Sequence, residues 1–555
     1  MKEQGANVGA APFGKWVHPV SAEAEEDVSA LGGKGSGLVL LRRLGLPVPP
    51  AFVVGTEACR IFLRDGRFPD GLDDELDAAI AVLEADTGRR FGGTDRPLVV
   101  SVRSGGSVSM PGMMSTVLDL GLTDATTAAL AAETGDRRFA LDSRQRLLTS
   151  FASAVHGLGA EELAAAARRG ARAPESPEAN AAAALADVEA FLLERTGDRV
   201  PDDARDQLDV AVRSVFRSWN TPRARTYRTL HGIPDDLGTA VVVQAMVFGN
   251  RDDRSGSGVA FSRDPNTGAR TPFGEVLFAR QGEDVVSGTS ATEPLGELAE
   301  REPEVWAGLL DAMGRIEEHY RDSCYVEFTF ESGRLWLLQV RRGRFTGGAA
   351  TRVAVDLVDE SVITRDEALL RVSPQDLRAL HTPRVDTAAG AVVLTRGLGA
   401  CPGVAVGRLA TTADKAVRMA ADGPVVLVRP HTSPADIHGL AAAAGVVTAH
   451  GGPASHAAVV ARSMAKPAVV GAADLTVDAA EGQVRVGART LTDGDTITID
   501  GGSGEVVLGE SPVTTATADP RLHRLLDWAD EVSGRTAGTE QDRLEAAHAV
   551  LRPDA

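Results

Sequence analysis

Apolar positions change their spacing along the chain, and each spacing predicts a different kind of element. Over residues 1–120, short apolar runs such as 50–55 and 97–106 lie between glycine turns, which predicts strands. Residues 120–230 carry alanine-rich amphipathic repeats with helical spacing, so we expect a helical region there. From Thr239 onward short apolar runs return and predict further strands. The pattern as a whole indicates a mixed α/β and α+β chain.

The second half of the chain separates into three stretches. Residues 346–384 lose strong periodicity and contain two prolines, as expected of a connector between domains. Residues 385–509 hold repeated short apolar runs that predict a compact α/β unit, and residues 510–555 predict one or two helices with polar ends. A chain of 555 residues is long enough for three or more domains, each with its own core.

Composition and charge narrow the classes of function. Hydrophobic residues make up 43% and charged residues 24%, as in soluble globular proteins, and no apolar run approaches the ~18 residues of a membrane span. Neither an export signal nor a disulfide framework is apparent, because Cys59, Cys324 and Cys401 lie far apart, so we expect a cytoplasmic protein. A net charge of −19 argues against nucleic acid or an anionic membrane as partner. The net charge does not exclude a small anionic ligand, because such a ligand needs only a few local cations.

Two glycine-rich segments hold candidate phosphate-binding cations. Glycines around Lys34 would let backbone N–H groups approach a phosphate, and the helix that follows would direct its positive end there. Gly35 stands where a Walker P-loop requires serine or threonine, so a plain turn is the alternative. In the second segment, a β-branched strand delivers Arg103 into a loop rich in glycine, serine and methionine. Its guanidinium would clamp a phosphate or form a buried structural salt bridge.

A predicted hairpin over residues 325–344 brings acid, amide and guanidinium groups to one sheet. Alternation puts Glu327 on the first strand, and it puts Gln339 and Arg341, two positions apart, on one face of the second. Oxygen ligands beside a phosphate clamp suit a magnesium–triphosphate site. A solvent-exposed polar face is the alternative.

A histidine at a predicted strand–turn–helix junction is the candidate nucleophile. An apolar strand ends at Gly451 and Gly452, and Pro453 begins a turn into a helix whose first turn holds Ser455 and His456. Imidazole attacks phosphorus, and a phosphohistidine is labile enough to pass its phosphate onward. The helix N-terminus would stabilise the anion and lower the histidine pKa, which keeps the ring neutral and nucleophilic. No HExxH spacing accompanies this histidine, which disfavours a zinc site.

These segments, in this order, resemble the pyruvate, phosphate dikinase family, and the resemblance runs along essentially the whole chain. The matching pieces are GGKGSGL, SVRSGGSVSMPGMMSTVLDLGL, FRSWNTPRA, VQAMVFGN, SGVAFSRDPNTG, QGEDVVSG, VEFTFESGRLWLLQVRRGR, ACPGVAVG, TSPADIHGL and SHAAVVARSMAKPAVVG. The related phosphoenolpyruvate synthases and drug phosphotransferases share the layout, but their arginine loop lacks a sequence of the SMPGMM type. The phosphate-using dikinase branch is therefore the closer match.

The resemblance implies a domain order. Residues 1–345 are expected to form an ATP-grasp-like nucleotide-binding region with a helical subdomain at about 120–230. Residues 346–384 are then a linker, and residues 385–509 a swivelling α/β phosphohistidine domain. Residues 510–555 resemble the helical entry to the family's C-terminal phosphoenolpyruvate/pyruvate barrel, and the barrel itself is expected to be absent.

The resemblance also assigns roles to residues that match the family's functional positions. These are Lys34, Arg103 and Arg341 for phosphate, Arg146 and Glu283 for the nucleotide, Glu327 and Gln339 for Mg²⁺, and His456 as the phosphorylated histidine. The implied chemistry is attack of His456 on the β-phosphorus of ATP with release of AMP. Inorganic phosphate then removes the terminal phosphoryl group as pyrophosphate.

Three positions depart from the family pattern. Tyr325 stands where an acid usually lies, two residues before the magnesium glutamate, so metal binding is expected to be weaker or rearranged. Ala454 replaces a threonine that is the regulatory phosphorylation site in the plant enzymes. Ser115 replaces an aspartate that usually follows the two methionines.

Three hypotheses about function follow. The leading one is an enzyme that uses ATP, Mg²⁺ and inorganic phosphate to charge His456, then hands phosphate to a separate acceptor protein or a small molecule. The others are a non-enzymatic phosphocarrier or regulatory protein, and an inactive remnant, to which Tyr325 and the absent barrel point. The joint presence of the phosphate, magnesium and histidine positions favours the enzyme. A homodimer is one candidate assembly.

Overall fold

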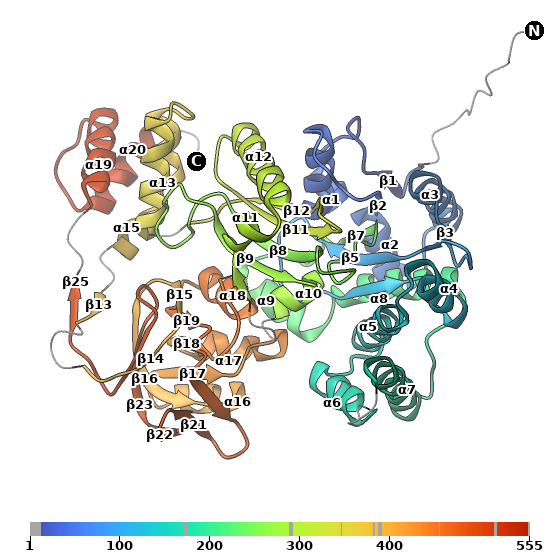
Figure 1. The fold of residues 1–555 in the computed structure, drawn as a ribbon. Helices are drawn as coiled ribbons and strands as arrows, with labels where there is room; N and C mark the ends of the chain where they lie inside the picture. The colour runs from blue at the N-terminus through green and yellow to red at the C-terminus, as the bar shows by residue number, and fades with distance from the viewer. Residues whose placement is uncertain are drawn as a thin grey trace, which may run out of the picture. The chain divides into compact units, whose positions relative to one another are not determined.

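The computed structural model describes residues 13–170, 176–287, 292–345, 347–380, 383–386, 391–453, 455–515 and 519–552. The chain divides into two compact units (Figure 1). The first comprises residues 1–247 with 336–339, and the second comprises 248–335 with 340–555. Among the residues described, no helix is both long and apolar enough to cross a membrane.

A five-stranded antiparallel sheet forms the centre of the first unit, in the order β1-β2-β7-β5-β6. Its strands are β1 (Val17–Pro19), β2 (Ala51–Val54), β5 (Val100–Gly105), β6 (Thr116–Leu120) and β7 (Ala240–Ala245). Every residue of β2 and β7 is buried, which is why these strands are continuous apolar runs instead of alternating ones. Arg103 lies on β5, opposite Val242 of β7 and Thr116 of β6.

Helices account for most of the rest of the first unit. Three precede the helical region, namely α1 (Val28–Arg43), α2 (Thr56–Asp65) and α3 (Leu72–Thr87), and a short pair, β3 (Arg90–Phe91) and β4 (Pro97–Leu98), follows them. The stretch expected to be helical holds α4 (Asp124–Thr134), α5 (Arg137–His156), α6 (Ala160–Gly170), α7 (Pro177–Thr196), α8 (Ala204–Ser218) and α9 (Pro222–His231). Side-chain N-caps such as Asp136 and Asp203 begin several of them, and left-handed glycines such as Gly157 end them.

The second unit begins with another five-stranded sheet, in the order β10-β9-β8-β11-β12, which we call the hairpin sheet. Its strands are β8 (Gly256–Phe261), β9 (Phe273–Phe278), β10 (Glu293–Pro294), β11 (Cys324–Glu331) and β12 (Arg334–Arg342). The helices between them are α10 (Gly282–Ser287), α11 (Glu297–Arg301) and α12 (Pro303–Tyr320). The predicted hairpin around the turn at 331–333 is therefore present as β11 and β12.

An eight-stranded sheet fills residues 391–509, a segment we call the histidine region. Its order is β14-β24-β23-β16-β17-β18-β19-β15, and β16 to β19 run parallel at its centre. The strands are β14 (Val393–Arg396), β15 (Leu398–Cys401), β16 (Val404–Ala410), β17 (Val425–Arg429), β18 (Gly445–Thr448), β19 (Ala468–Val470), β23 (Thr496–Asp500) and β24 (Glu505–Leu508). The helices are α16 (Ala413–Ala420), a 3-10 turn (Pro434–Asp436), α17 (Ile437–Ala442) and α18 (His456–Ser463). A small sheet of β20 (Leu475–Asp478), β21 (Gln483–Val486) and β22 (Arg489–Thr492) completes the region.

Residues 347–380, predicted from sequence as a connector, are largely helical. They form α13 (Gly347–Asp359), α14 (Arg365–Arg371) and α15 (Pro374–Leu380). Their apolar side chains share one core with α19 (Pro520–Ser533) and α20 (Glu540–Leu551) from the tail, and we call these five helices the bundle. Strands β13 (Pro383–Val385) and β25 (Val513–Thr515) pair antiparallel, so the chain enters and leaves the histidine region through adjacent strands (Figure 1).

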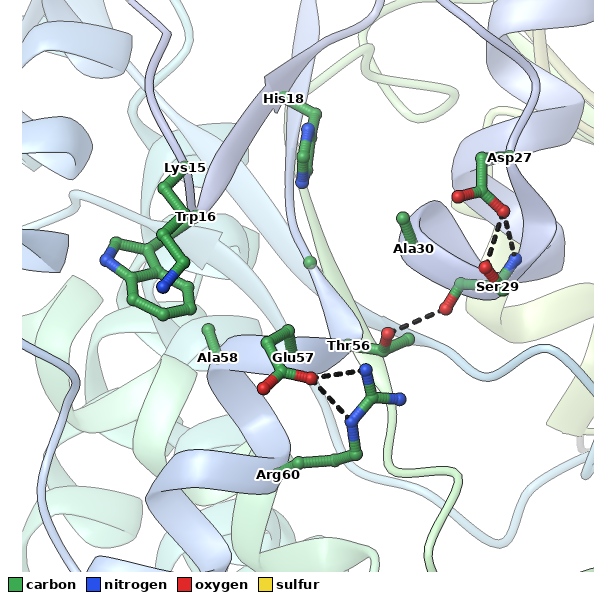
Figure 2. Close-up of a pocket in the computed structure, with 11 residues that line it drawn as sticks. Lys15, Trp16, His18, Asp27, Ser29, Ala30, Thr56, Glu57, Ala58 and Arg60 are labelled. Carbon is green, nitrogen blue, oxygen red and sulfur yellow. Dashed lines mark hydrogen bonds and ion pairs between the residues drawn. The ribbon is translucent and has the colours of Figure 1, made fainter.

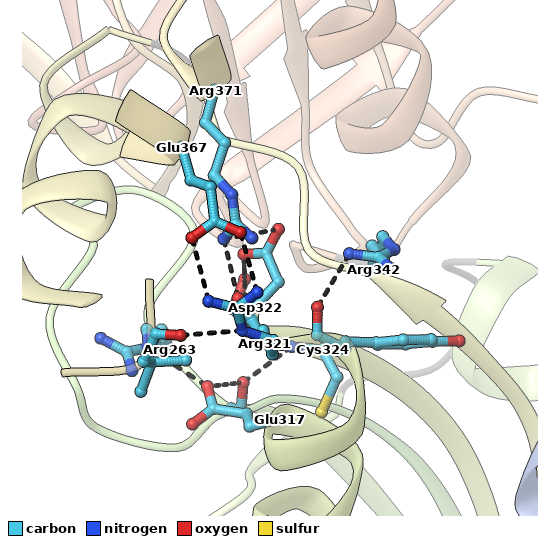
Figure 3. Close-up of polar contacts among 12 residues, drawn as sticks. Arg263, Glu317, Arg321, Asp322, Cys324, Arg342, Glu367 and Arg371 are labelled. Carbon is cyan, nitrogen blue, oxygen red and sulfur yellow. Dashed lines mark hydrogen bonds and ion pairs between the residues drawn. The ribbon is translucent and has the colours of Figure 1, made fainter. Parts of the chain in front are cut away.

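An ion-pair network holds the bundle against the hairpin sheet and α12 (Figure 3). Arg263, whose side chain is fully buried, contacts Glu317 of α12 at 3.2 Å and Glu360, just after α13, at 2.7 Å. Arg321 pairs with Glu367 of α14 at 2.8 Å. Arg371, also of α14, donates to the Arg321 carbonyl. The buried charge of Arg263 needs close partners, and Glu317 and Glu360 provide them.

Candidate functional site

The first unit brings the two predicted phosphate-binding segments into contact. Gly32 interrupts α1 with a left-handed φ of 65°, and a Cβ there would lie 1.5 Å from the Gly105 carbonyl oxygen. The Gly33 N–H donates to the Gly106 carbonyl at 2.9 Å. The Lys34 ammonium donates to the Ser104 carbonyl at 2.8 Å. Only glycine allows this approach, which brings Lys34 beside the strand that carries Arg103.

The loop after Arg103 is held by residues to which the sequence assigned no role. Arg223 of α9 donates through Nε to the Met113 carbonyl at 3.1 Å, and Met113 is fully buried. The Ser115 N–H donates to Ser218 Oγ of α8 at 3.2 Å. Arg223 and Ser218 both belong to FRSWNTPRA, one of the segments that resemble the family. The resemblance therefore marked this segment, although it assigned no role to either residue. Ser115 thus serves as a backbone anchor for this loop.

Arg146 lies on α5, beside the neighbouring strand β6. Its Nε is 4.0 Å from Oδ2 of Asp119, a fully buried residue with a left-handed φ of 55°. Because β6 pairs with β5, the strand of Arg103, both predicted arginines belong to one part of the first unit.

Glu327, Arg341 and Tyr325 meet on the hairpin sheet of the second unit. Arg341 Nη2 lies 4.0 Å from Glu327 Oε1, and the Tyr325 hydroxyl donates to the same oxygen at 3.4 Å. The Tyr325 ring packs against Phe261, with ring centroids 4.9 Å apart. Burial raises the pKa of Tyr325 well above its usual range, so the phenol is a protonated donor and a poor metal ligand.

Gln339 and Glu283 are the remaining predicted nucleotide-site residues. Gln339 lies on β12 two positions before Arg341, so the two side chains share a face of the strand. It is 1% exposed, and neither its Oε1 nor its Nε2 has a hydrogen-bond partner among the described residues. Glu283 lies in the first turn of α10. No group of three or more His, Cys, Asp or Glu side chains that could hold a metal occurs within the described part of the chain.

His456 begins α18, and Ser455 is the N-cap, accepting from the Ala458 N–H. Thr432 Oγ1 lies 3.1 Å from His456 Nδ1, whereas Nε2 is buried and has no partner among the residues described. Burial lowers the pKa of His456 to about 4, and the Asp436 carboxylate opposes the shift only in part. The imidazole is therefore neutral near physiological pH. Ala454 lies outside the described residues.

The loop that carries Thr432 is rigidly built. The Ser433 N–H and hydroxyl both donate to Asp436 Oδ2, at 2.8 and 3.1 Å, and cap the 3-10 turn. Arg429 Nη2 lies 3.5 Å from the other Asp436 oxygen. Sequence reasoning missed Thr432 as a partner of His456, although it is the first residue of the resembling segment TSPADIHGL.

A separate cavity of about 260 Å³ lies in the first unit and contains none of the predicted site residues (Figure 2). Its charged lining is internally paired. Asp27 accepts from Ser29, and Arg60 donates to Glu57. Burial lowers the pKa of His18, which also lines it. Nothing in this cavity indicates a ligand.

Two family models match parts of the chain. The model described as pyruvate phosphate dikinase, AMP/ATP-binding domain, matches residues 62–295, and the model described as PEP-utilising enzyme, mobile domain, matches residues 421–504. Pyruvate, phosphate dikinase of Rhizobium meliloti is 41% identical over 560 residues, covering 97% of this chain and 62% of that protein. Its counterpart from Clostridium symbiosum is 39% identical, covering 96% and 63%. Pyruvate, phosphate dikinase 2 of Oryza sativa is 42% identical, covering 93% and 60%.

The chain belongs to the pyruvate, phosphate dikinase family. It spans about three fifths of the length of these curated relatives. As a dikinase-family chain, it carries Arg103, Arg146 and Glu283 inside the AMP/ATP-binding match. His456 and its partner Thr432 lie inside the mobile-domain match.

Proposed function

We propose that these 555 residues form an ATP-dependent dikinase-type phosphotransferase that carries phosphate on His456. The observation that supports this most strongly is the state of the imidazole. Nδ1 has a hydroxyl partner, Nε2 has none among the described residues, and the ring is neutral. A neutral imidazole held by one nitrogen presents a lone pair on the other.

The proposed reaction proceeds in two balanced steps. In the tautomer in which Nδ1 donates its proton to Thr432 Oγ1, His456 attacks the β-phosphorus of ATP through Nε2. The bond from that phosphorus to the α–β bridging oxygen breaks, AMP leaves, and a pyrophosphohistidine remains. Inorganic phosphate then attacks the terminal phosphorus, so that pyrophosphate leaves and a phosphohistidine remains.

We propose that the nucleotide binds in an ATP-grasp-like region. Lys34, Arg103, Arg146 and Arg341 would supply positive charge to the phosphates, and Glu283 would contact the nucleotide. The contact of the Gly32–Lys34 turn with the Ser104–Gly106 loop supports a shared phosphate site for two of these cations.

The family chemistry also implies Mg²⁺, and the residues present fit it. Gln339 has a buried amide without a partner among the described residues, and Glu327 offers a carboxylate, so both provide the oxygen ligands that Mg²⁺ prefers. The bound ion would neutralise charge on the triphosphate. Tyr325 stays protonated and would take no part in coordination.

We further propose that the histidine region swivels between sites. The bundle is fixed to α12 and to the end of β8 by the buried ion pairs of Arg263. The paired strands β13 and β25 would then form the hinge through which the region moves. The charged histidine would deliver its phosphate to an acceptor site outside these 555 residues.

Labelled ATP tests the charging reaction directly. With [β-³²P]ATP, Mg²⁺ and phosphate, label should remain on the protein, whereas label from [γ-³²P]ATP should leave as pyrophosphate once phosphate is added. His456→Ala should take up neither label. The matched control is His438→Ala, because His438 lies in the same region but is exposed and pairs with Asp414. Label uptake by His456→Ala equal to that of the parent chain would refute the assignment.

A further inference from the structure

Phosphorylation of His456 through Nε2 would place a positive charge inside the histidine region. In the tautomer in which Nδ1 keeps its proton and donates to Thr432, the attack on phosphorus uses the Nε2 lone pair. The N–P bond forms as the bond to the AMP oxygen breaks, and no proton leaves the ring, so the phosphorylated ring is an imidazolium cation. Burial already lowers the pKa of the free ring to about 4. A cation in this place therefore needs a negative charge nearby.

Asp436 supplies a negative charge to this ring. It lies in the same loop as Thr432, is 7% exposed, and acts electrostatically on His456 in the direction that favours the protonated imidazole. The Ser433 N–H and hydroxyl donate to its Oδ2 at 2.8 and 3.1 Å. One side chain therefore shapes the loop that holds Nδ1 and also acts on the ring as a charge.

The capping contacts alone do not explain why this residue is an acid. An amide would accept the two hydrogen bonds from Ser433 equally well, since amides also serve in capping boxes. A carboxylate this buried costs free energy unless a cation lies beside it. Arg429, the last residue of β17, places Nη2 3.5 Å from Oδ1 of Asp436 and donates through Nη1 to the Thr411 carbonyl at 3.2 Å. A buried ion pair where an amide would suffice indicates that the charge itself has a use.

Other titratable or charged groups lie on the elements around the ring. His431 is in the loop between β17 and the 3-10 turn, the exposed His450 follows β18, and Arg462 is further along α18. The charged group with the largest effect on the ring is Asp436. The variants below leave the three other groups unchanged, so these contribute equally to each measurement.

We propose that Asp436 is a positioning residue for the phosphotransfer, which holds Thr432 against Nδ1 and balances the positive charge that the ring gains with its phosphate. This inference rests on the proposed function and deepens it. In the phosphorylated chain, Asp436 keeps Nδ1 protonated, and the group that later leaves phosphorus is then neutral imidazole instead of imidazolate. The same carboxylate favours both the uptake of phosphate and its release to an acceptor.

Asp436→Asn tests the charge, because the amide keeps an acceptor for Ser433. Single-turnover charging by [β-³²P]ATP should slow by about tenfold, with the ATP concentration for half-maximal rate unchanged. The rate at which the phosphorylated chain loses its phosphate, measured against pH, reports protonation of the phosphorylated ring. Its inflection should move down by about one pH unit. Asp414→Asn is the matched control, because Asp414 is an exposed acid of the same region that pairs with His438.

Ser433→Ala separates the charge from the shape of the loop. It removes one hydrogen bond to Asp436 but keeps the carboxylate, so the inflection should stay at the parental pH. An equal downward shift in Ser433→Ala and Asp436→Asn would mean that only the loop matters and would overturn the charge-balancing role. An inflection at the parental pH in Asp436→Asn would also overturn it, whatever the charging rate, and would leave the proposed function intact.

Two further outcomes are decisive. If Asp436→Asn does not fold, Arg429→Gln replaces it as the test. Removal of the cation beside Asp436 should move the inflection upward, and an unchanged or lower inflection would overturn the proposal. Failure of the parent chain to take up label from ATP would overturn the proposed function, and this inference with it.

Discussion

At the scale of single residues, burial sets the protonation state of His456. An ordinary histidine is half protonated near pH 6.5, whereas burial lowers the pKa of this one to about 4. Protonation occupies the lone pair, so the ring loses its nucleophilicity only as the pH falls toward the lowered pKa. We expect single-turnover charging to show no histidine titration between about pH 7.5 and 5.5 and to fall as pH 4 is approached. A half-loss of rate near pH 6.5 would contradict this.

In the proposed reaction, the hydroxyl of Thr432 would select which imidazole nitrogen reacts. Thr432→Val keeps the shape of the side chain but removes the partner of Nδ1, so the ring can rotate or change tautomer. We expect charging to slow by about tenfold. Thr432→Ser keeps a hydroxyl and should restore most of the rate. If Thr432→Val and Thr432→Ser react alike, the hydrogen bond has no orienting role.

Tyr325 offers a test of the proposed magnesium site, because its hydroxyl contacts Glu327. Tyr325→Asp places a carboxylate beside Glu327, so the Mg²⁺ concentration that gives half-maximal charging should fall. The maximal rate should fall as well, because the small side chain leaves the packing on Phe261 unfilled. Titration of Mg²⁺ in single-turnover assays measures both quantities. An unchanged or higher Mg²⁺ requirement would mean that this chain coordinates Mg²⁺ with a geometry different from that of the family.

At the scale of elements, the buried network around Arg263 should matter for stability. Arg263→Met leaves Glu317 and Glu360, whose side chains are 18% and 19% exposed, without their buried cation. Losing one partner of a buried ion pair costs about 3–5 kcal/mol, which thermal unfolding would register as a lower midpoint. Arg270→Met is the matched control, because Arg270 lies 3.7 Å from the same Glu360 but is 66% exposed. Its effect should stay below about 1 kcal/mol. If the two variants lower the midpoint of thermal unfolding equally, the buried ion pairs of Arg263 have no special role in stability.

The sequence predicts elements well where the signal is local. Gly32 and Gly452 mark turns from composition alone, and apolar runs locate β2, β7 and the hairpin of β11 with β12. The bundle could not be found in this way. Its short helices bury side chains such as Leu369 against residues such as Leu544, far along the chain, and no periodicity within 346–384 encodes that pairing.

The same limit applies to the candidate site. His456 stands out in the sequence because a Gly-Gly turn and a helix start surround it. Thr432 does not, since it gains its role from a contact with a loop distant in sequence. Tyr325 could be recognised only as a departure from a family pattern. Its ring packs on Phe261 of another strand, and burial keeps its phenol protonated.

At the scale of the whole molecule, we expect that the phosphorylation of His456 by ATP can be separated from the transfer of its phosphate to an acceptor. Transfer to pyruvate requires a site that holds the enolate and supplies a metal and an acid. Within the described residues no cluster of three or more His, Cys, Asp or Glu side chains offers such a metal site, and His456 is the residue proposed to carry phosphate during charging. The purified 555-residue chain, given ATP, Mg²⁺, phosphate and pyruvate, should accumulate phosphohistidine and form no phosphoenolpyruvate. Intact-protein mass spectrometry would measure the phosphohistidine, and an enzyme-coupled assay would measure the phosphoenolpyruvate. Addition of a competent acceptor protein or small molecule should discharge the histidine. Phosphoenolpyruvate formed by the chain alone, with contamination excluded, would place the acceptor site within these residues and refute the separation.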